Sequence, residues 1–488
     1  MINGVTISFF LFLLGYVAIG AYSATKRSET ADDYLLASRS VHPVLAALSS
    51  VATDNSGFMF MGLTGSCYMT GISGAWLIVG WIAGEWVAWL FVHRRLREGS
   101  ERVGANTVPG YLGHGIAGGR TVTALAGAVT LFFLGIYSAA QLTAGSKALS
   151  HFHMHPTMGV VLGAAIVLAY CFSGGIRASI WTDAAQSVVM LISMLILFAV
   201  AAHYAGGLGA MWDALASVKV KGADGAVTSA HLTNPMPSYQ FGFAAFILGW
   251  LAAGFGMVGQ PHIMVRAMAI DSPESVSTAR RIYVVWYIVF AAACVGVGLA
   301  ARAVIPWDHD VGRQAAAGVL SGDAELAFPT LAGALLGPVL VGFMLAGLFA
   351  ATISTADSQV LSCSAALSQD LAPRLGQTYR GVKLATVLVT AVALIIALFG
   401  GSVFQYVTFA WSGLAASLGP LMVVRVMGWR ISTPAAVTMM VVGLATVLLW
   451  IFALHLNGAI YEALPGMVAG FVVYAGWAGA TGGIRERG

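Results

Sequence analysis

Charged side chains are scarce in this chain. Asp, Glu, Lys and Arg make up 9% of its 488 residues, whereas an ordinary soluble domain has about 25%. The net charge is only +4, and the basic residues form no cluster of the kind that binds nucleic acid, so we expect no nucleic-acid partner. Hydrophobic residues make up 58% of the chain, and the mean hydropathy is +0.83. This composition predicts an all-α polytopic membrane protein whose partner is the lipid bilayer.

Cysteine is also rare, and the motifs of common enzymes are missing. The four cysteines, Cys67, Cys171, Cys294 and Cys363, lie in apolar segments without CxxC spacing. They are expected to be buried free thiols with neither a disulfide nor a metal role. No Ser-His-Asp set, HExxH, P-loop or GxGxxG motif lies on suitable structure. We therefore expect neither an enzyme nor an ATP-driven pump.

Apolar stretches long enough to cross a bilayer occur thirteen times. They lie near 2–24, 44–70, 72–92, 121–147, 157–173, 178–205, 240–260, 281–305, 328–362, 382–400, 403–424, 431–454 and 460–480. The first stretch has no basic residues before it, so it is predicted to be a retained span and not a cleaved signal peptide.

The positions of the basic residues test this number of spans. If the N-terminus is outside, 19 of the 24 Lys and Arg residues fall on the inner side. The five on the outer side are Lys147, Lys219, Lys221, Arg302 and Arg313. We therefore predict thirteen transmembrane helices in the plasma (inner) membrane, with a cytoplasmic C-terminus. The long polar connections at 206–239 and 306–327 then lie outside, and 211–215 is expected to form a short interfacial helix.

Two spans carry matching interruptions. One, at 52–65, contains Asp54 and several Ser and Gly residues, and the other, at 254–261, contains Gly254, Gly256, Gly259 and Pro261. Such a pair is typical of inverted-repeat transporters, which bind their substrate near the middle of the bilayer. The spacing predicts five-helix repeats at 44–205 and 240–424 within a single transmembrane transporter domain, 1–488. The three glycines serve either as hinges or as close-packing positions.

Four carboxylates fall inside spans: Asp54, Glu85, Asp183 and Asp357. A charge at that depth costs about 2.5–3.5 kcal/mol on insertion scales, so it normally faces a partner, a cavity or an ion. A structural role, with neighbouring Ser, Thr or Trp groups as partners, stays open for each of them. No Lys or Arg is expected in mid-membrane, so a substrate carboxylate would meet backbone N–H groups, helix N-termini or the ion itself.

A polar stripe surrounds Asp357. Ala351, Ser354, Thr355 and Ser358 share one helix face at i, i+3, i+4 and i+7 spacing. Their carbonyl and hydroxyl oxygens are the ligands that hard cations such as sodium choose. The alternative is that the hydroxyls only hold packed helices together.

Several motifs in order along the chain resemble the sodium:solute symporter family, and most closely the bacterial sodium/proline symporters within it. They are Asp-Tyr-Leu-Leu at 33–36 with Arg-Ser at 39–40, Ala-Leu at 47–48 leading to Asp-Asn-Ser-Gly at 54–57, Ser-Ile-Trp-Thr-Asp at 179–183, Gly-Gln-Pro-His-Ile at 259–263 with Arg266, Ser-Thr at 354–355, and Ala-Trp-Ser-Gly at 410–413 leading to Gly-Pro at 419–420.

The resemblance implies a thirteen-span, LeuT-like fold with a 5+5 inverted repeat, and it implies specific sites. The sodium ligands would be the carbonyls of Ala52, Asn55 and Ala351 and the hydroxyls of Ser354 and Thr355. Asp54 and Arg39 would couple sodium binding to transport. A candidate second sodium site would involve Asp183, Ser354, Asp357 and Ser358. The substrate would bind to Ser56, Gly57, Tyr137, Gln141, Phe255, Met257 and Trp411.

The chain also departs from that family pattern. Proline carriers place Trp and Tyr where Ala253 and Met257 stand here, and relatives usually have a hydroxyl at the position of Asp357. We therefore expect sodium-coupled uptake of a small organic solute, proline or a related amino acid first. A sodium/monocarboxylate or other organic-solute symporter, a membrane sensor that binds solute without transporting it, and proton coupling through Asp54 or Glu85 remain alternatives.

Overall fold

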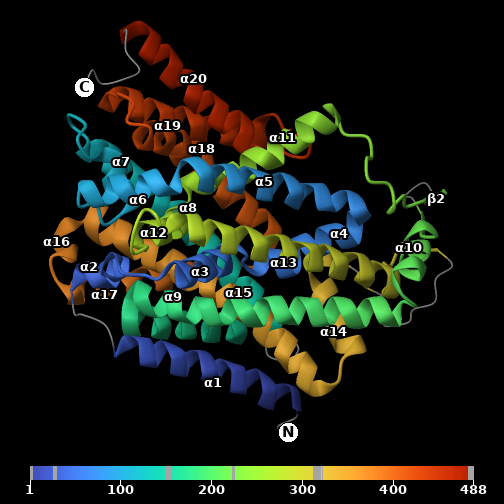
Figure 1. The fold of residues 1–488 in the computed structure, drawn as a ribbon. Helices are drawn as coiled ribbons and strands as arrows, with labels where there is room; N and C mark the ends of the chain where they lie inside the picture. The colour runs from blue at the N-terminus through green and yellow to red at the C-terminus, as the bar shows by residue number, and fades with distance from the viewer. Residues whose placement is uncertain are drawn as a thin grey trace.

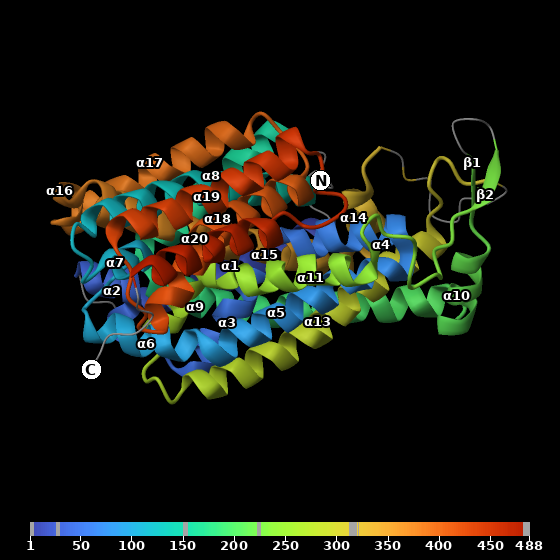
Figure 2. The ribbon, with the colours of Figure 1, turned by 90° about the horizontal axis from the view of Figure 1, so that it is seen from above.

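Long helices that run along one common direction form most of the molecule (Figures 1 and 2). The computed structural model describes residues 4–25, 30–149, 155–221, 226–311, 320 and 322–481. Lys26, Arg27, Arg313, Arg485 and Arg487 lie outside the described residues. The long helices are α1 (Gly4–Ala24), α5 (Ala75–Phe91), α8 (Arg120–Leu149), α9 (Pro156–Tyr204), α13 (Val276–Val304), α15 (Pro338–Ala365), α17 (Tyr379–Ala397), α18 (Val403–Val426), α19 (Thr433–Leu448, followed by a π-helical segment, Leu449–Ala453) and α20 (Ala463–Thr481).

Eleven segments of the described chain are long and apolar enough to cross a membrane. Two of the thirteen expected spans are not separate members of this set. The stretch 157–173 is a shorter apolar helix (Pro156–Phe172), and the second half of 44–70 is counted together with α5 in one segment, Phe58–Phe91. The structure thus establishes a polytopic helical bundle with eleven candidate spans, and it does not by itself give the number thirteen.

The helix labelled α9 reverses direction at a glycine. Gly175 has φ +59° and ψ −148°, a conformation that side chains with a Cβ rarely adopt. A Cβ at this position would also lie 2.6 Å from Tyr34. The chain therefore turns here between the predicted spans 157–173 and 178–205.

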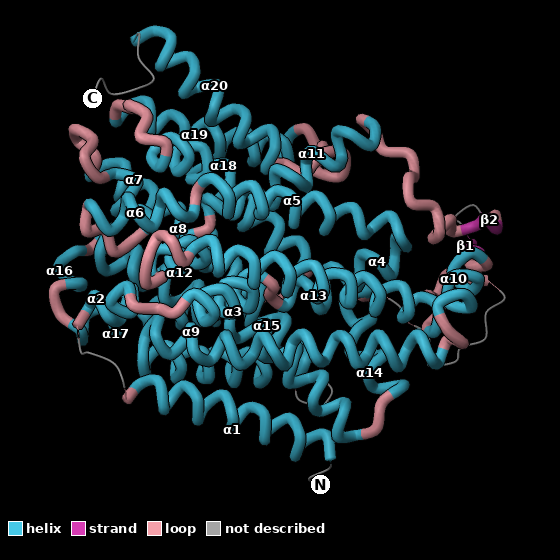
Figure 3. Tube along the Cα trace, in the orientation of Figure 1, coloured by secondary structure: helices cyan, strands magenta, loops and turns pink. Residues whose placement is uncertain are grey.

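Short elements gather at the two ends of the bundle, and the irregular segments lie mainly there (Figure 3). One end, called the α6 end below, carries α2 (Ala31–Leu36) with the 3₁₀ turn Ala37–Arg39, α6 (His93–Arg102), α7 (Val108–Gly113) and α16 (Pro373–Gly376). The other, called the α10 end, carries α10 (Leu208–Ala216), the antiparallel strands β1 (Lys219–Lys221) and β2 (Val227–Ser229), and α14 (Ala327–Leu335), preceded by a 3₁₀ turn at Ala324–Leu326. The predicted short helix at 211–215 is confirmed as α10.

One predicted span boundary was wrong. The stretch 328–362 is divided, because α14 ends at Leu335 and Pro338 starts α15 as a separate helix. The stretch 240–260 agrees with the candidate span Gly242–Gly259, and Pro261 then starts a further short helix. This broken segment consists of α11 (Gly242–Phe255), a 3₁₀ turn at Gly256–Gly259, and α12 (Pro261–Ala269).

Glycines allow the second broken span to pack closely against its neighbours. A Cβ at Gly254 would lie 1.8 Å from the Trp81 carbonyl oxygen, and a Cβ at Gly84 would lie 2.0 Å from the Leu251 carbonyl oxygen. A Cβ at Gly259 would lie 2.6 Å from the Leu414 carbonyl oxygen. Of the two roles considered for these glycines, the geometry supports close packing.

The centre of the bundle is polar as well as apolar. Helix α15 packs against α1, α8, α9 and α17, and it also meets α3 (Pro43–Asp54), the first half of the first broken span. The four cysteines are buried and free. The buried polar residues near this centre form the site described next.

Candidate functional site

The first broken span loses its helical conformation directly after Asp54. His42 caps the start of α3 by accepting a hydrogen bond from the Val44 N–H, and Pro43 follows at the first helical position. At the other end, Asn55 has φ −83° and ψ 65°, outside the helical region. The span resumes as a π-helical segment (Phe58–Leu63) and α4 (Thr64–Thr70). The break leaves backbone carbonyls of the last turn of α3 without helical partners.

Oxygens of α3 and α15 converge at this break. The Ser354 hydroxyl donates to the Ala52 carbonyl at 3.0 Å and lies 3.2 Å from the Ala351 carbonyl. The Thr355 hydroxyl lies 2.9 Å from the Thr53 carbonyl, 3.0 Å from the Ala351 carbonyl and 3.4 Å from the Ala52 carbonyl. All of these residues are fully buried. We call these oxygens of Ala52, Ala351, Ser354 and Thr355 the oxygen cluster.

The spacing of the oxygen cluster suits a small, hard cation. Oxygens about 3.0–3.4 Å apart can all lie on one coordination sphere when each ligand is about 2.3–2.6 Å from the ion. Four of the five predicted sodium ligands are thus together. The fifth, Asn55, is the next residue after α3, and its side-chain amide turns back to donate to the Val51 carbonyl at 2.9 Å.

Asp54 lies beside two residues that the sequence motifs did not include. The Tyr283 hydroxyl is 2.9 Å from Asp54 Oδ2 and 2.8 Å from Glu85 Oε2. Trp81 Nε1 donates to Glu85 Oε1 at 2.6 Å. Tyr283 comes from α13, and Glu85 and Trp81 lie one turn apart on α5. Only the charge of Glu85 inside an apolar stretch could have drawn attention to this group.

Arg39, the other predicted coupling residue, is at the α6 end. Its guanidinium donates to the carbonyls of Met268, at 3.0 Å, and Ala105, at 2.6 Å, and to the Ser100 hydroxyl at 3.1 Å. It therefore ties the segment before α3 to the end of α12 and to the loop after α6. Among the described residues, the hydrogen-bond partners of Arg39 and of Asp54 are different.

The residues of the candidate second sodium site meet around an arginine. Arg266 Nη2 lies 3.0 Å from Asp183 Oδ2 and also donates to the Ser358 hydroxyl. Asp357 Oδ1 accepts from the hydroxyls of Ser358, at 3.0 Å, and Ser179, at 3.2 Å. Asp183, Asp357, Ser358 and Arg266 are almost completely buried. Arg266, on α12 just beyond the candidate span Gly242–Gly259, is therefore buried inside the bundle.

This group holds two carboxylates against a single guanidinium. Ser49 also belongs to it, because its hydroxyl donates to Asp183 Oδ2 at 2.7 Å and accepts from Arg266 Nε at 2.8 Å. Asp183 Oδ1 is buried and has no hydrogen-bond partner among the described residues. One negative charge is thus left over if both carboxylates are ionised. Ser49, Ser179 and Arg266 were not among the predicted site residues, although Ser179 and Arg266 lie in the recognised motifs.

Four of the predicted substrate residues come together beyond the break in the first span. The Gly57 N–H donates to Gln141 Oε1 at 3.0 Å, and the Ser56 and Tyr137 hydroxyls are 3.4 Å apart. The ring of Tyr137 meets the ring of His262 edge to face, with centroids 5.6 Å apart. Gln141 Nε2, Gln260 Oε1 and both ring nitrogens of His262 are buried without partners among the described residues. These polar atoms suit a small ligand that both donates and accepts hydrogen bonds.

The other three predicted substrate residues belong to α11, the 3₁₀ turn after it, and α18. Trp411 Nε1 donates to the Ala253 carbonyl at 2.7 Å, and its ring centroid is 4.8 Å from that of Trp81. Met257 is fully buried and Phe255 is half-buried. Among the described residues, no hydrogen bond joins these three residues to Ser56 or Gln141. Trp81 connects the two groups, since its ring also lies 5.8 Å from that of Phe58.

Two cavities approach the buried site from opposite ends. A cavity of about 530 Å³ at the α10 end is lined by Gly62, Lys147, Glu325 and Phe404, among others. The Phe404 ring stacks on Phe58 at 5.3 Å and separates this cavity from Ser56 and Gly57. Lys147 forms ion pairs of 2.7 Å with both Asp323 and Glu325 at its edge.

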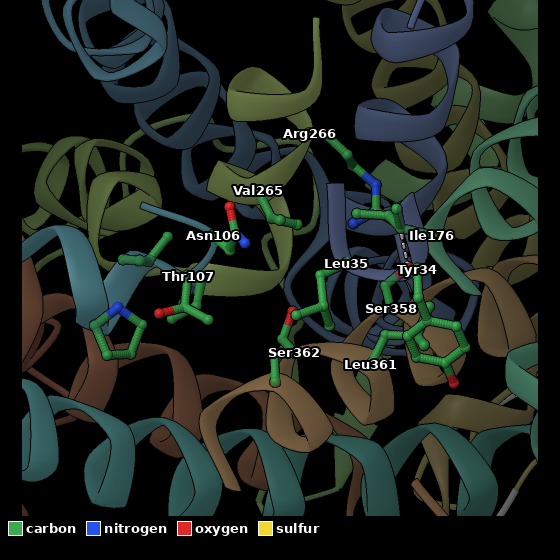
Figure 4. A pocket seen from close by; sticks show the side chains of 14 residues that line it. Tyr34, Leu35, Asn106, Thr107, Ile176, Val265, Arg266, Ser358, Leu361 and Ser362 are labelled. Atoms are coloured by element: carbon green, nitrogen blue, oxygen red, sulfur yellow. Dashed lines mark hydrogen bonds between the residues drawn. The ribbon is translucent and has the colours of Figure 1, made fainter. Parts of the chain in front are cut away.

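The cavity at the α6 end is much smaller, about 20 Å³, which is room for one or two water molecules. Figure 4 shows Arg266 and Ser358 on its wall, with Tyr34 and Leu35 of α2 and Asn106 and Thr107 of the loop before α7.

Comparison with known proteins gives one consistent result. The model of the sodium:solute symporter family matches residues 34–443. The sodium/proline symporter of Escherichia coli (strain K12) is 33% identical over 477 residues, which are 96% of this chain and 91% of that protein. The high-affinity proline transporter PutP of Bacillus subtilis (strain 168) is 33% identical, over 92% of each chain.

Solved structures extend the likeness to the fold. A Na⁺-coupled sialic acid symporter in a substrate-bound, outward-open state superimposes with a TM-score of 0.80 at 17% identity, over 100% of this chain and 99% of that one. Mhp1, a nucleobase-cation-symport-1 family transporter in a closed conformation, has a TM-score of 0.55 at 16% identity, over 92% of this chain and 95% of that one.

Proposed function

This chain belongs to the sodium:solute symporter family, and from that premise we propose that it couples inward sodium flow to the uptake of proline or a closely related amino acid. The observation that carries the proposal is the oxygen cluster, in which unpaired carbonyls of a broken helix meet two hydroxyls of α15. Sodium and a small-molecule substrate are the partners of this cycle.

The architecture we propose is the thirteen-span, LeuT-like bundle with two inverted five-helix repeats, 44–205 and 240–424, in one domain. The eleven candidate spans support it, together with the separate helix Pro156–Phe172 and the broken pair α3 and α4, which precedes α5. The two broken spans then open the two repeats. One span, α1, precedes the repeats, and α19 and α20 follow them.

The orientation we propose places the α6 end in the cytoplasm and the N-terminus outside, in the inner membrane. Basic residues support it. At the α6 end, Arg39, Arg97, Arg177 and Arg425 all bind backbone carbonyls of neighbouring loops and helix ends. The α10 end has few basic residues, and Lys147 and Arg302 there are paired with acidic side chains. This asymmetry is the one that the positive-inside rule describes.

The main sodium ion would bind to the oxygen cluster, with the Asn55 carbonyl as a fifth ligand. Because α3 and α15 belong to different repeats, an ion held by both favours the conformation in which the two helices are close. Sodium binding can shift the conformational equilibrium only through such a difference in affinity between states. Asp54 would add the negative potential that attracts the ion, and Arg39 would hold the cytoplasmic segment that must move when the ion leaves.

If the cycle uses a second sodium ion, we propose that it binds at Asp183, Asp357 and Ser358. The leftover negative charge and the unpartnered Asp183 Oδ1 support a further cation there. The Arg266 guanidinium already satisfies one of the two carboxylates, so a cycle with a single sodium ion is equally consistent. The charge moved per substrate molecule in proteoliposomes, for wild type and for Asp357→Ser, separates these two possibilities.

The substrate would lie among Ser56, Gly57, Tyr137 and Gln141, and extend toward Phe255, Met257 and Trp411. Gln141 Nε2 can donate to a carboxylate, and Gln260 Oε1 can accept from an ammonium or imino group. Both kinds of atom are needed for a zwitterionic amino acid, whereas a monocarboxylate has no N–H to donate. The presence of both a buried unpaired donor and a buried unpaired acceptor among these residues therefore favours an amino acid.

The driving force also distinguishes the two substrate classes. One sodium ion that enters down about 100 mV gains about 2.3 kcal/mol, and a tenfold concentration gradient adds about 1.4 kcal/mol. The total of about 3.7 kcal/mol supports roughly 500-fold accumulation of a zwitterion. A monocarboxylate moved with one sodium ion is electroneutral and could be accumulated only about tenfold.

The experiment that tests the function is uptake into liposomes that contain the purified protein. Proline uptake that requires an inward sodium gradient and is stimulated by an inside-negative potential would support the proposal. Uptake that continues with a proton gradient alone would show proton coupling. Binding of proline without counterflow would indicate a sensor that binds solute without transporting it. Electroneutral uptake of a monocarboxylate would indicate a sodium/monocarboxylate symporter.

A further inference from the structure

Glu85 and Tyr283 form a hydrogen-bonded group with Asp54, and the proposed sodium site assigns no role to either residue. Both are 1% exposed, and Asp54 is 7% exposed. The three side chains come from three different elements, α5, α13 and α3. Trp81 extends the group, because its indole N–H donates to the second oxygen of Glu85.

The number of hydrogens in this group determines its protonation. The Tyr283 hydroxyl has one hydrogen, yet it lies 2.9 Å from a carboxyl oxygen of Asp54 and 2.8 Å from one of Glu85. It can donate to only one of them. The other contact is favourable only if that carboxyl group carries a proton and donates it to the tyrosine oxygen. The two carboxylates therefore cannot both be ionised in this arrangement.

The absence of a nearby cation leads to the same conclusion, that Asp54 and Glu85 are not both ionised. Among the described residues, no Lys, Arg or His side chain pairs with Asp54 or Glu85; their side-chain partners are Tyr283, Trp81 and each other's carboxyl group. Two unpaired anions buried side by side would each lose several kcal/mol of hydration free energy, with no cation nearby to offset the loss.

We propose that Glu85 is a positioning residue for Asp54, and that it acts through Tyr283 as a neutral hydrogen-bond donor. The hydrogen bonds then run in one direction, from Trp81 to Glu85, from Glu85 to Tyr283 and from Tyr283 to Asp54. Asp54 keeps its negative charge, and its Oδ1 atom has no hydrogen-bond partner among the described residues. The group fixes the rotamer of a carboxylate that stands two residues after the Ala52 carbonyl.

This inference rests on the proposed function, because it assigns to Asp54 the role of attracting sodium. The reverse arrangement, with an ionised Glu85 and a neutral Asp54, uses the same distances. The two arrangements differ in which amide substitution they tolerate. In Glu85→Gln the amide oxygen still accepts from Trp81, and the NH₂ group still donates to Tyr283. In Asp54→Asn the charge is lost.

The test compares the sodium concentration for half-maximal uptake with the maximal rate at saturating sodium. We expect Glu85→Gln to stay within about twofold of wild type in both values. Glu85→Leu and Tyr283→Phe should raise the half-maximal sodium concentration at least about fivefold and keep the maximal rate within about twofold. Tyr287→Phe is the matched control, since Tyr287 is buried one turn further along α13, and it should leave both values unchanged.

A double variant separates positioning from general damage to the fold. If Glu85 acts only through Asp54, then Glu85→Leu should raise the half-maximal sodium concentration no further in an Asp54→Asn background. An additional loss in the double variant, or a Glu85→Gln protein as impaired as Glu85→Leu, would overturn the proposal. Tyr283→Phe carries the same test if Glu85→Leu fails to accumulate in the membrane. If Asp54→Asn itself has normal sodium activation, the coupling role of Asp54 fails and this inference fails with it, whereas the proposed symport is tested separately by the liposome uptake.

Discussion

Ser354 donates its hydroxyl hydrogen to the carbonyl of Ala52 across 3.0 Å, although the two residues are 302 positions apart in the chain. The contact joins the last turn of α3 to the middle of α15. The Ala52 carbonyl has no helical partner, and the Ser354 hydroxyl can turn a lone pair toward an ion. Substitution of Ser354 should therefore affect sodium binding in the proposed cycle.

Loss of either hydroxyl of the oxygen cluster should weaken sodium activation. We expect Ser354→Ala and Thr355→Ala each to raise the half-maximal sodium concentration about tenfold, equivalent to about 1.4 kcal/mol of binding free energy. Ser138→Ala serves as a control, because the Ser138 hydroxyl is equally buried but has no partner among the described residues. Equal effects of the three substitutions on uptake kinetics would show that the cluster does not hold the ion.

Asp54→Asn should impair sodium binding more than it impairs the fold. The substitution keeps the size of the side chain and removes its charge, so we expect a rise of more than about tenfold in the half-maximal sodium concentration. The amount of protein in the membrane should stay close to wild type, as measured by quantitative blotting. Normal sodium-driven uptake by this variant would contradict the coupling role.

The buried pair of Arg266 and Asp183 should stabilise the bundle only as a pair. Removal of one partner leaves a buried charge and typically costs about 3–5 kcal/mol. We expect Arg266→Met to lower the thermal unfolding midpoint in detergent strongly. The double variant Arg266→Met with Asp183→Asn should recover part of that loss. A double variant less stable than either single one would show that the two residues act independently.

His93 should make the protein less stable in mild acid. Its ring is buried at the start of α6, stacked on Trp89 at 4.1 Å, and burial lowers its pKa from 6.5 to about 4. Between these two values the unfolded chain binds a proton that the folded protein does not, so stability falls as the pH falls from about 6.5 toward 4.

The shift corresponds to about 3 kcal/mol of unfolding free energy. His93→Phe keeps the stacking and removes the titration, so its unfolding midpoint should depend less on pH over this window. An identical pH dependence in wild type and variant would assign the acid sensitivity to other groups.

The sequence predicted the helical bundle and the broken first span because long apolar stretches and an isolated carboxylate are local signals. It also predicted that Ser354 and Thr355 share a face, since helical spacing is enough for that. The family resemblance supplied the partners on α3. The oxygens of Ala52, Ala351, Ser354 and Thr355 do meet, and so do the residues Ser56, Gly57, Tyr137 and Gln141.

What the sequence did not reveal depends on contacts between distant segments. The burial of Arg266 against Asp183 and Ser358 depends on α12, α9 and α15 meeting, which no local pattern indicates. Tyr283 looked like an ordinary aromatic residue of an apolar helix, and its role depends on α5 and α13 meeting beside α3. The position of the Trp81 ring between those of Phe58 and Trp411 is likewise a matter of packing.

The most direct measurement is the equilibrium binding of radioactive sodium to the purified protein in the absence of substrate. We expect saturable binding by wild type and by Ser138→Ala, and an affinity about tenfold lower for Thr355→Ala. Binding that is absent in wild type, or that is unchanged in Thr355→Ala, would contradict the account of a sodium ion held between α3 and α15.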